Sequence, residues 1–260
     1  MNRGTRDLAT PVGLALAFVV IVISNMLEGG NPTSVLLLPP MLLVFGVTLL
    51  VTIAGGTVAD ARDALSALRR AFTGRQERTD DVIPTVVSLA ERARREGLLS
   101  LEESLAEVDD PFLVKGVTLA IDGTDPEELR DILEAQVEAK RRDDRRSAKF
   151  FADAGAYAPT IGIVGTVMGL VHVLERLADP DQLGHLIAAA FVATLWGVVS
   201  ANVMWLPIAS RLRRLSEIEV ARMVLVVEGV SAIQSGANPR LVEQRLLALL
   251  PARAPEQEAA

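Results

Sequence analysis

The sequence predicts an all-α membrane protein with four transmembrane helices, a helical cytoplasmic domain between the second and third, and a cytoplasmic C-terminal helix. Half of its 260 residues are hydrophobic, yet 23% are charged. The two kinds are segregated, because four blocks contain no Asp, Glu, Lys or Arg: residues 8–27, 29–59, 154–174 and 182–210. Each block supplies the roughly 20 apolar residues, at about 1.5 Å each, that a helix needs to cross a bilayer. A soluble cytosolic enzyme is therefore excluded.

The expected elements follow from these blocks in chain order. The first membrane helix should cover residues 8–27, and because its only Ala-x-Ala motif lies inside the apolar run, we expect it to be retained rather than cleaved as a signal peptide. The second should cover residues 34–57 and be kinked by Pro39 and Pro40. The remaining parts are a cytoplasmic domain at 58–152, membrane helices at 153–174 and 184–210, and a cytoplasmic C-terminal helix and tail at 211–260.

The distribution of basic residues predicts the topology. Of 26 Lys and Arg, 16 lie in residues 61–152, 7 in residues 211–260 and 2 in the N-terminal arm, whereas only Arg176 lies in a short connection. Four spans place both termini and the middle segment on one side, which therefore holds 25 of the 26. By the positive-inside rule that side is the cytoplasm. We expect a multi-pass plasma-membrane protein with both termini cytoplasmic.

The charged segments show apolar residues at helical spacing. Breaks are expected at Gly97, Pro111, Gly116 and the turn at residues 122–126. In that turn Asp125 should cap a helix that begins at Pro126 and runs through residues 140–146 into the third membrane helix. A helix at residues 216–230 should extend the fourth membrane helix, and the polar tail at 251–260 should be disordered.

The third and fourth membrane helices differ from the first two in carrying small residues at spacings of three and four. The residues expected to pack are Gly162, Gly165, Gly169, Gly197 and Ala201. Small side chains let helix backbones approach closely in lipid, where packing drives association. We expect these two helices to form a tight inner pair, although such residues serve a purely structural role as readily as a functional one.

An ion pathway normally uses an ionisable side chain in the membrane, and none of the four blocks contains an Asp, Glu, Lys or Arg. If the protein conducts ions, the carboxylate must therefore come from a partner. Thr166 and Thr194 lie on the small-residue faces, where each can bond a partner carboxylate, solvate a cation or bond back to its own helix. His172 and His185 lie near the outer helix ends and are expected at the membrane interface.

Two prolines lie at similar depth near the cytoplasmic ends of these helices. Pro159 is six residues after Asp153, and Pro207 is four residues before Arg211. Each proline removes a backbone hydrogen bond and permits bending. The pair can form matched hinges, or each can simply end a regular membrane segment.

Composition also excludes several function classes. The chain has no Cys and two His, which removes disulfides, thiolate nucleophiles and most zinc sites. No nucleophile–base pair, metal set or phosphate loop is recognisable, so we expect neither an enzyme nor a cofactor. A net charge of −7 and the lack of interleaved aromatics argue against nucleic-acid binding.

Three segments together resemble the A subunits of bacterial flagellar motor stators, the MotA/PomA family of the MotA/TolQ/ExbB superfamily. They are Ala156 to Leu170, Ala190 to Asn202 with Pro207 beyond it, and the charged stretch Arg94 to Glu102. The order of two close membrane helices, a large cytoplasmic segment, two more helices and a tail is similar over nearly the whole chain. Without the resemblance, the favoured interpretation of Arg92, Arg94, Arg95 and Glu96 is an ordinary solvated helix face, since surface charge usually contributes little.

The resemblance implies an ion-driven rotary motor in the bacterial inner membrane, which serves motility and chemotaxis. A subunits form a ring around the membrane helices of a B subunit (MotB/PomB), whose Asp carries the H⁺ or Na⁺ and whose periplasmic domain grips peptidoglycan. It implies that Arg94 and Glu102 contact the rotor switch protein, and that Pro159 and Pro207 couple ion passage to helix movement. Thr194 would line the ion path.

The conducted ion and the family branch are left open. Thr166 occupies a position where sodium-driven members tend to carry Thr and many proton-driven members Ala, which favours sodium, but Ala193 departs from the Thr-Thr pair of some sodium-driven members. An ExbB/TolQ-like energiser of envelope transport shares the last two membrane helices but typically has one span before its cytoplasmic segment. The short loop at residues 28–32 between two spans favours the stator. A non-conducting membrane scaffold would use the small-residue faces for packing alone.

Overall fold

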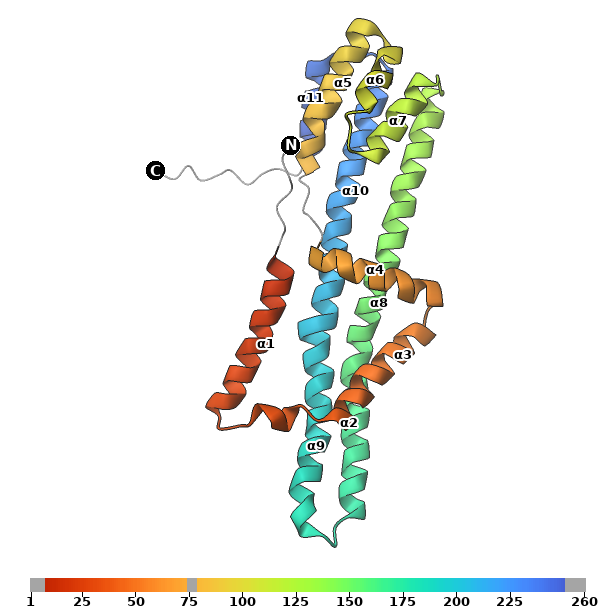
Figure 1. Ribbon diagram of the computed structural model, residues 1–260. Helices are drawn as coiled ribbons and strands as arrows, with labels where there is room; N and C mark the ends of the chain where they lie inside the picture. Colours follow the sequence, from red (N-terminus) through yellow and green to blue (C-terminus); the bar gives the residue numbers. More distant parts are fainter. Residues whose placement is uncertain (1–7, 74–78, 251–260) are drawn as a thin grey trace, which may run out of the picture. The chain divides into compact units, whose positions relative to one another are not determined.

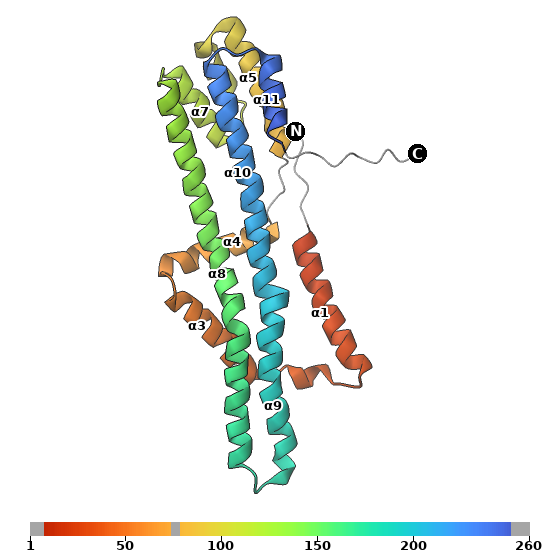
Figure 2. The ribbon, with the colours of Figure 1, turned by 180° about the vertical axis from the view of Figure 1, so that it is seen from behind.

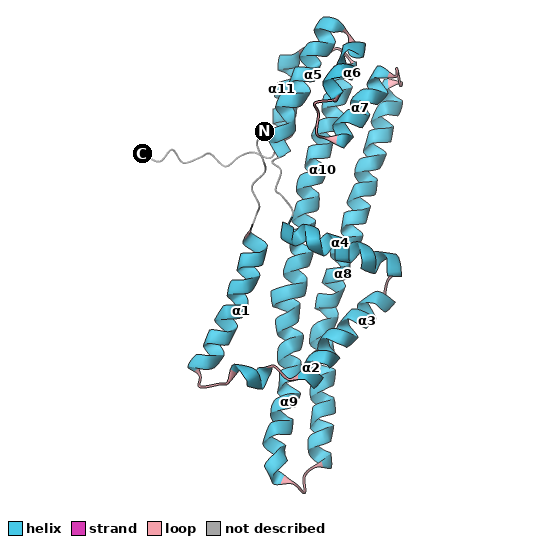
Figure 3. Ribbon diagram, in the orientation of Figure 1, coloured by secondary structure: helices cyan, strands magenta, loops and turns pink. Residues whose placement is uncertain are grey.

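The computed structural model describes residues 8–73 and 79–250, and every regular element within them is helical (Figures 1 and 3). The α-helices are α1 (Ala9–Leu27), α2 (Leu38–Met41), α3 (Val47–Ala54), α4 (Val58–Thr73), α5 (Ile83–Glu96), α6 (Leu101–Leu105), α7 (Pro111–Ile121), α8 (Pro126–Glu175), α9 (Pro180–Val199), α10 (Leu206–Gln234) and α11 (Pro239–Ala248). Short 3₁₀ turns lie at Pro32–Val35, Thr79–Val82 and Leu98–Ser100, and π-helical turns at Leu42–Gly46 and Ser200–Trp205. The expected all-helical class is confirmed.

Three helical stretches among the described residues are long and apolar enough to cross a membrane. They are α1, the 50-residue α8, and the 55-residue stretch from Pro180 to Gln234 that joins α9 to α10 through a π-helical turn. The two long stretches run from an apolar segment into a charged one without a break. This confirms that the third and fourth apolar helices continue beyond their apolar segments.

The second apolar block forms a shorter helix than residues 34–57. Its continuous part extends from Leu38 to Ala54 through α2, a π-helical turn and α3. Pro39 and Pro40 lie in the first turn of α2, so the expectation that they kink the helix is wrong. Proline favours the first turn because the N–H that it lacks would have no partner within the helix.

The chain divides into two compact units. Within the described residues, unit 1 comprises 79–143 and 216–250, and unit 2 comprises 8–73 and 144–215. The helices α8 and α10 contribute residues to both units.

Unit 1 is built around an aliphatic core. Its fully buried side chains come from α5, α6, α7, α8, α10 and α11 and include Val86, Leu101, Leu113, Leu129, Val226 and Leu246. The helix α11 lies beside α5 (Figures 1 and 2) and divides the C-terminal segment, expected as one helix and a tail, into two helices. The break occurs because Gly236 adopts φ +66° and the Asn238 side chain caps α11. The tail at 251–260, expected to be disordered, lies outside the described residues.

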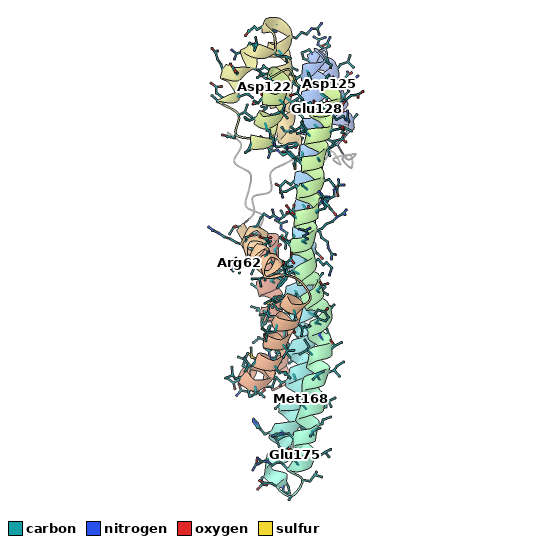
Figure 4. The ribbon with its side chains drawn as sticks, turned by 90° about the vertical axis from the view of Figure 1, so that its right-hand side faces the viewer. Arg62, Asp122, Asp125, Glu128, Met168 and Glu175 are labelled. Atoms are coloured by element: carbon teal, nitrogen blue, oxygen red, sulfur yellow. The ribbon has the colours of Figure 1, made fainter. Side chains whose placement is uncertain are left out.

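The predicted start of α8 is confirmed, whereas the break predicted at Gly116 is wrong. The Asp125 Oδ1 accepts from the backbone N of Glu127 at 2.9 Å, which confirms the predicted cap (Figure 4 shows Asp125 and Glu128 near this turn). Gly116, expected to break the helix, instead lies inside α7 and is buried. A Cβ there would meet Val230 at 3.0 Å and Leu133 at 3.2 Å, so this glycine serves close helix packing.

Unit 2 packs α4 against parts of α8 and α10. Ala64, Ala67 and Ala71 recur on one face of α4 and are buried against a cluster that includes Phe151 and Leu212. Small side chains let α4 lie close to both long helices. These contacts hold α8 and α10 next to the segment where α8 packs on α9. The candidate site lies in that segment.

Candidate functional site

The helices α8 and α9 approach backbone to backbone in unit 2, where they lie side by side (Figures 1 and 2). A Cβ built on Gly162 would lie 2.9 Å from the Ala193 carbonyl oxygen, and one built on Gly197 would lie 2.7 Å from that of Ala158. Farther along, a Cβ built on Gly165 would meet side chains instead, the Ala193 Cβ at 2.7 Å and Leu43 at 2.8 Å. Any larger side chain at these positions would force the two helices apart.

The remaining small residues follow the same line of contact. A Cβ on Gly169 would lie 2.6 Å from the Ala190 Cβ. Ala201 is 1% exposed in the π-helical turn after α9, within the cluster that holds Phe151 and Leu212. All five predicted packing residues therefore lie at contacts among helices of unit 2.

Two hydroxyl groups meet inside this helix pair. Thr166 of α8 and Thr194 of α9 form a hydrogen bond with each other through their Oγ1 atoms. The Thr166 hydroxyl also lies 3.2 Å from the Gly162 carbonyl oxygen and 3.1 Å from that of Ala190, and the Thr194 hydroxyl lies 3.3 Å from the Gly162 carbonyl. The Thr166 hydroxyl is thus within reach of both its own helix and α9, and the Thr194 hydroxyl reaches across to α8.

The number of donors and acceptors in this hydroxyl pair determines which further group it can bind. Two hydroxyls carry two hydrogens and four lone pairs. The nearby carbonyls can only accept, and the two hydroxyls can share one hydrogen between them. Oxygen lone pairs, rather than hydrogens, are therefore what the pair can offer to a third group. A cation or a protonated carboxylic acid is the kind of group that lone pairs bind.

The two predicted hinge residues lie at different levels, because Ala158, next to Pro159, packs on Gly197, whereas Leu206, next to Pro207, packs on Gly155. The expectation that they lie at similar depth is wrong. Pro159 lies inside α8, and Pro207 lies in the first turn of α10 directly after the π-helical turn Ser200–Trp205. Gly155, one turn before Pro159, packs so closely on Leu206 that an added Cβ would lie 2.8 Å from its side chain. A π-helical turn and an interior proline both interrupt regular α-helical bonding.

A cavity of about 840 Å³ opens beside the helix pair. Its walls come from α2, the π-helical turn after it, α3, α8 and α9, and are almost entirely apolar. His172 and His185 are the two histidines on its lining. His172 Nδ1 lies 3.4 Å from a Glu175 carboxylate oxygen, and both side chains are exposed.

The predicted rotor residues belong to unit 1. Arg94 lies in the last turn of α5 and Glu102 in the first turn of α6, and both are exposed. The neighbouring Arg92 ties the two helices together, because its guanidinium contacts Glu96 at 3.2 Å, Ser104 at 2.6 Å and Glu103 at 3.3 Å. The residue expected to be part of a solvated charge run is thus a structural clamp.

Sequence reasoning missed two polar features of unit 2. Asp144 of α8 is 4% exposed and forms a 2.6 Å ion pair with Arg70 of α4. Trp196 of α9 donates from Nε1 to the Val35 carbonyl at 2.6 Å, which fastens the segment before α2 to the helix pair. The apolar block at residues 182–210 gives no sign of the Trp196 bond. The position of Asp144 in the charged run shows only that a carboxylate is present, not that it is buried.

The sequence of the chain is similar to those of a family of proton channel proteins. A model of the MotA/TolQ/ExbB proton channel family matches residues 104–224. Motility protein A of Bacillus subtilis (strain 168) is 36% identical over 248 residues, which are 95% of this chain and 92% of that protein. Chemotaxis protein PomA of Vibrio alginolyticus is 31% identical over 240 residues, 92% and 94% of the two chains.

A solved structure extends the similarity to three dimensions. The flagellar MotAB stator complex from Bacillus subtilis contains a chain that matches with a TM-score of 0.87 at 36% identity. The match covers 94% of this chain and 96% of that one. The similarity thus includes α1 to α3 as well as the long helices.

Proposed function

Since the chain belongs to the MotA/TolQ/ExbB proton channel family, we infer that it is the A subunit of a flagellar motor stator. The observation that carries this function is the α8–α9 pair, in which two hydroxyls meet within blocks that contain no Asp, Glu, Lys or Arg. Such a pair needs a partner that brings a carboxylate. A B subunit with a membrane Asp meets that need, and a solved MotAB complex contains a chain that this one resembles.

We propose that the lone pairs of Thr166 and Thr194 face the ion as it passes the B-subunit carboxylate. In one step of transport they accept from the protonated acid or coordinate the cation directly. Oxygen ligands of this kind suit hard cations such as Na⁺. Sodium is the favoured ion in this proposal, because sodium-driven members of the family tend to carry Thr at the position of Thr166.

The two prolines supply the mechanical element of this proposal. Pro159 and the π-helical turn before Pro207 interrupt their helices next to the contact of Gly155 with Leu206. Bending is cheapest where backbone bonds are already missing. A change of charge at the carboxylate would move α8 and α9–α10 about these points. The movement would then reach the charged segment that offers Arg94 and Glu102 to the rotor switch protein.

The proposed placement in the bilayer uses four spans. α1, α8 and the α9–α10 stretch are long enough to cross, and the 17 residues from Leu38 to Ala54 reach about 25 Å, which is the short end of the spanning range. With four spans, 25 of the 26 basic residues lie on the cytoplasmic side of the inner membrane, together with both termini. Several copies would form a ring around the B subunit.

The proposal separates the chain from its nearest alternatives. An ExbB/TolQ-like energiser would typically have one span before its charged segment, whereas α1 and the helix from Leu38 to Ala54 both precede it here. A membrane scaffold would use the glycine contacts and conduct nothing. No enzymatic activity is proposed.

Purification of the tagged chain from its native membranes tests the assignment of partner. We expect a co-purifying protein with a single membrane span that bears an Asp and with a peptidoglycan-binding region. The gene for this protein is expected to neighbour that of the chain. Co-purification with a partner of outer-membrane transport instead would overturn the stator assignment in favour of the ExbB/TolQ type.

A further inference from the structure

Leu99 is the most exposed large apolar side chain of unit 1 within the described residues. Its side chain is 73% exposed, whereas Leu241, Leu247 and Leu249 of the same unit are each 51% exposed. A single exposed leucine is ordinary on a protein surface. The position of Leu99 in the chain, between Arg94 and Glu102, is what sets it apart.

The local fold holds Leu99 outward. Gly97 ends α5 with φ +87°, and the 3₁₀ turn Leu98–Ser100 follows. Leu98 packs against the core of unit 1, and Leu101 is fully buried in it. Leu98 and Leu101 thus face inward, whereas Leu99 faces solvent and adds nothing to the core.

The turn that carries Leu99 is braced on both sides. The Arg92 guanidinium bonds Glu96 at the end of α5 and Ser104 of α6, at 3.2 Å and 2.6 Å. Within the turn, the Ser100 hydroxyl donates to the Gly97 carbonyl at 2.7 Å. A braced turn loses little conformational entropy when it docks, so an exposed apolar side chain on it is suited to binding.

Charges flank Leu99 on both sides in the chain. Arg94 and Arg95 at the end of α5 and Glu102 and Glu103 at the start of α6 are all exposed. Protein interfaces commonly place an apolar contact at the centre of a polar, charged rim, where the charges set orientation and the apolar contact sets the dissociation rate. A basic pair, an apolar side chain and an acidic pair match a surface that has an apolar pocket between acidic and basic groups.

We propose that Leu99 is the apolar anchor of the contact with the rotor switch protein, and that the flanking charges orient it. This proposal rests on the proposed stator function. Full burial of a leucine side chain strengthens binding by a factor of about ten or more. Charge alone would give a contact that weakens steeply with salt, whereas an apolar anchor would give a contact that persists in part.

Binding of the purified rotor switch protein from the same genome to membranes containing the A and B subunits tests the proposal. The variants are Leu99→Ser, Leu99→Met and, as a control of similar type on α11, Leu247→Ser. We expect Leu99→Ser to weaken binding about tenfold at moderate salt, with membrane abundance and B-subunit co-purification unchanged. Leu99→Met should restore most of the binding, and Leu247→Ser should bind as the parent does.

The results of these binding measurements distinguish the anchor proposal from the stator function on which it rests. Binding by Leu99→Ser within twofold of the parent would overturn the anchor, and so would an equal loss in Leu247→Ser. If the parent complex passes cations but does not bind the rotor protein, the anchor fails while the conducting function stands. If the parent neither assembles with a B subunit nor passes cations, the stator function itself fails.

Discussion

Thr166 and Thr194 place two hydroxyls at the contact of α8 and α9, where Gly162 lets the backbones meet. Without the glycine contacts, the hydroxyls would lie too far apart to bond. The small residues and the threonines therefore act together, the first setting the separation of the helices and the second the chemistry that this separation allows. Two substitutions separate these contributions.

Removal of the Thr194 hydroxyl should reduce cation flux while the complex still assembles. In Thr194→Ala the pair loses one oxygen, and flux should fall about tenfold, which corresponds to one hydrogen bond to a charged group. Thr194→Ser keeps the hydroxyl and should retain most of the flux. Thr160→Ala is the control, since that exposed hydroxyl bonds only to the Tyr157 carbonyl of its own helix in the contacts described. Flux through Thr194→Ala equal to that through Thr160→Ala would remove Thr194 from the pathway.

Substitution of Gly162 should instead lower stability. A Cβ at this position would lie 2.9 Å from the Ala193 carbonyl oxygen and 3.1 Å from the Gly197 Cα, so α8 and α9 must separate. Gly162→Ala should destabilise the protein by about 1–3 kcal/mol, measured as the loss of thermal stability in detergent. Gly13→Ala in α1 is the control, because a Cβ there meets nothing within 4 Å. Equal stability of the two variants would contradict the close packing of α8 on α9.

The helix α4 begins with a cap that its sequence encodes locally. The Asp60 Oδ2 accepts from the Thr57 backbone N at 2.8 Å and from its hydroxyl at 2.7 Å, and the Asp60 N donates back to the Thr57 hydroxyl at 3.2 Å. These bonds from Thr57 lower the pKa of the Asp60 carboxyl below its ordinary value of 3.8. The cap fixes the start of the helix that packs against α8 and α10.

The stability contributed by this cap should depend on pH. Because the folded pKa of Asp60 is depressed, its contribution is present above pH 3.8 and is lost as pH falls through the lowered value. Asp60→Asn should therefore melt at a lower temperature than the parent at neutral pH, and the difference should shrink in acid. Asp63→Asn in the same helix is the control. A difference between parent and Asp60→Asn that does not change with pH would contradict the role of the charged carboxylate.

The start of a helix can be predicted from sequence where residues close to it in the chain determine it. Asp125 and Pro126 mark the start of α8 because a cap and a first-turn proline act within a few residues. The sequence does not show that Pro39 and Pro40 begin a helix, because an apolar run on both sides of a proline pair fits a kink as well as a helix start. The packing role of Gly116 cannot be predicted locally, because its neighbours Leu133 and Val230 are distant in the sequence.

The whole chain divides its tasks between apolar helices and charged ones. The residues proposed for the ion path lie in unit 2, and those proposed for the rotor lie in unit 1. The types of these residues could be predicted from sequence, since a charge-free block and a charged stretch are visible in it. The bond between Thr166 and Thr194 could not, because it depends on how α8 and α9 are rotated against each other. The burial of Asp144 against Arg70 depends likewise on the path of α4.

Charge reversal at Arg94 should impair rotation without affecting the membrane complex. Arg94 is exposed at the end of α5, so Arg94→Glu places a repulsive charge in the proposed rotor contact and removes no core packing. Swimming speed should fall by more than half, while B-subunit co-purification stays at the parent level. The control is Arg240→Glu, which reverses an exposed charge on α11. Normal swimming of the Arg94→Glu strain over a range of loads would argue against this contact.

Complementation of a stator-less strain tests the link between ion flow and rotation. Cells lacking their own A and B subunits receive this chain with its B partner, and swimming speed is recorded against external sodium and against a protonophore. We expect rotation to return and its speed to follow the gradient of one cation, with sodium favoured by Thr166. Cells that assemble the complex in their membranes yet neither pass cations nor rotate would contradict the proposed function.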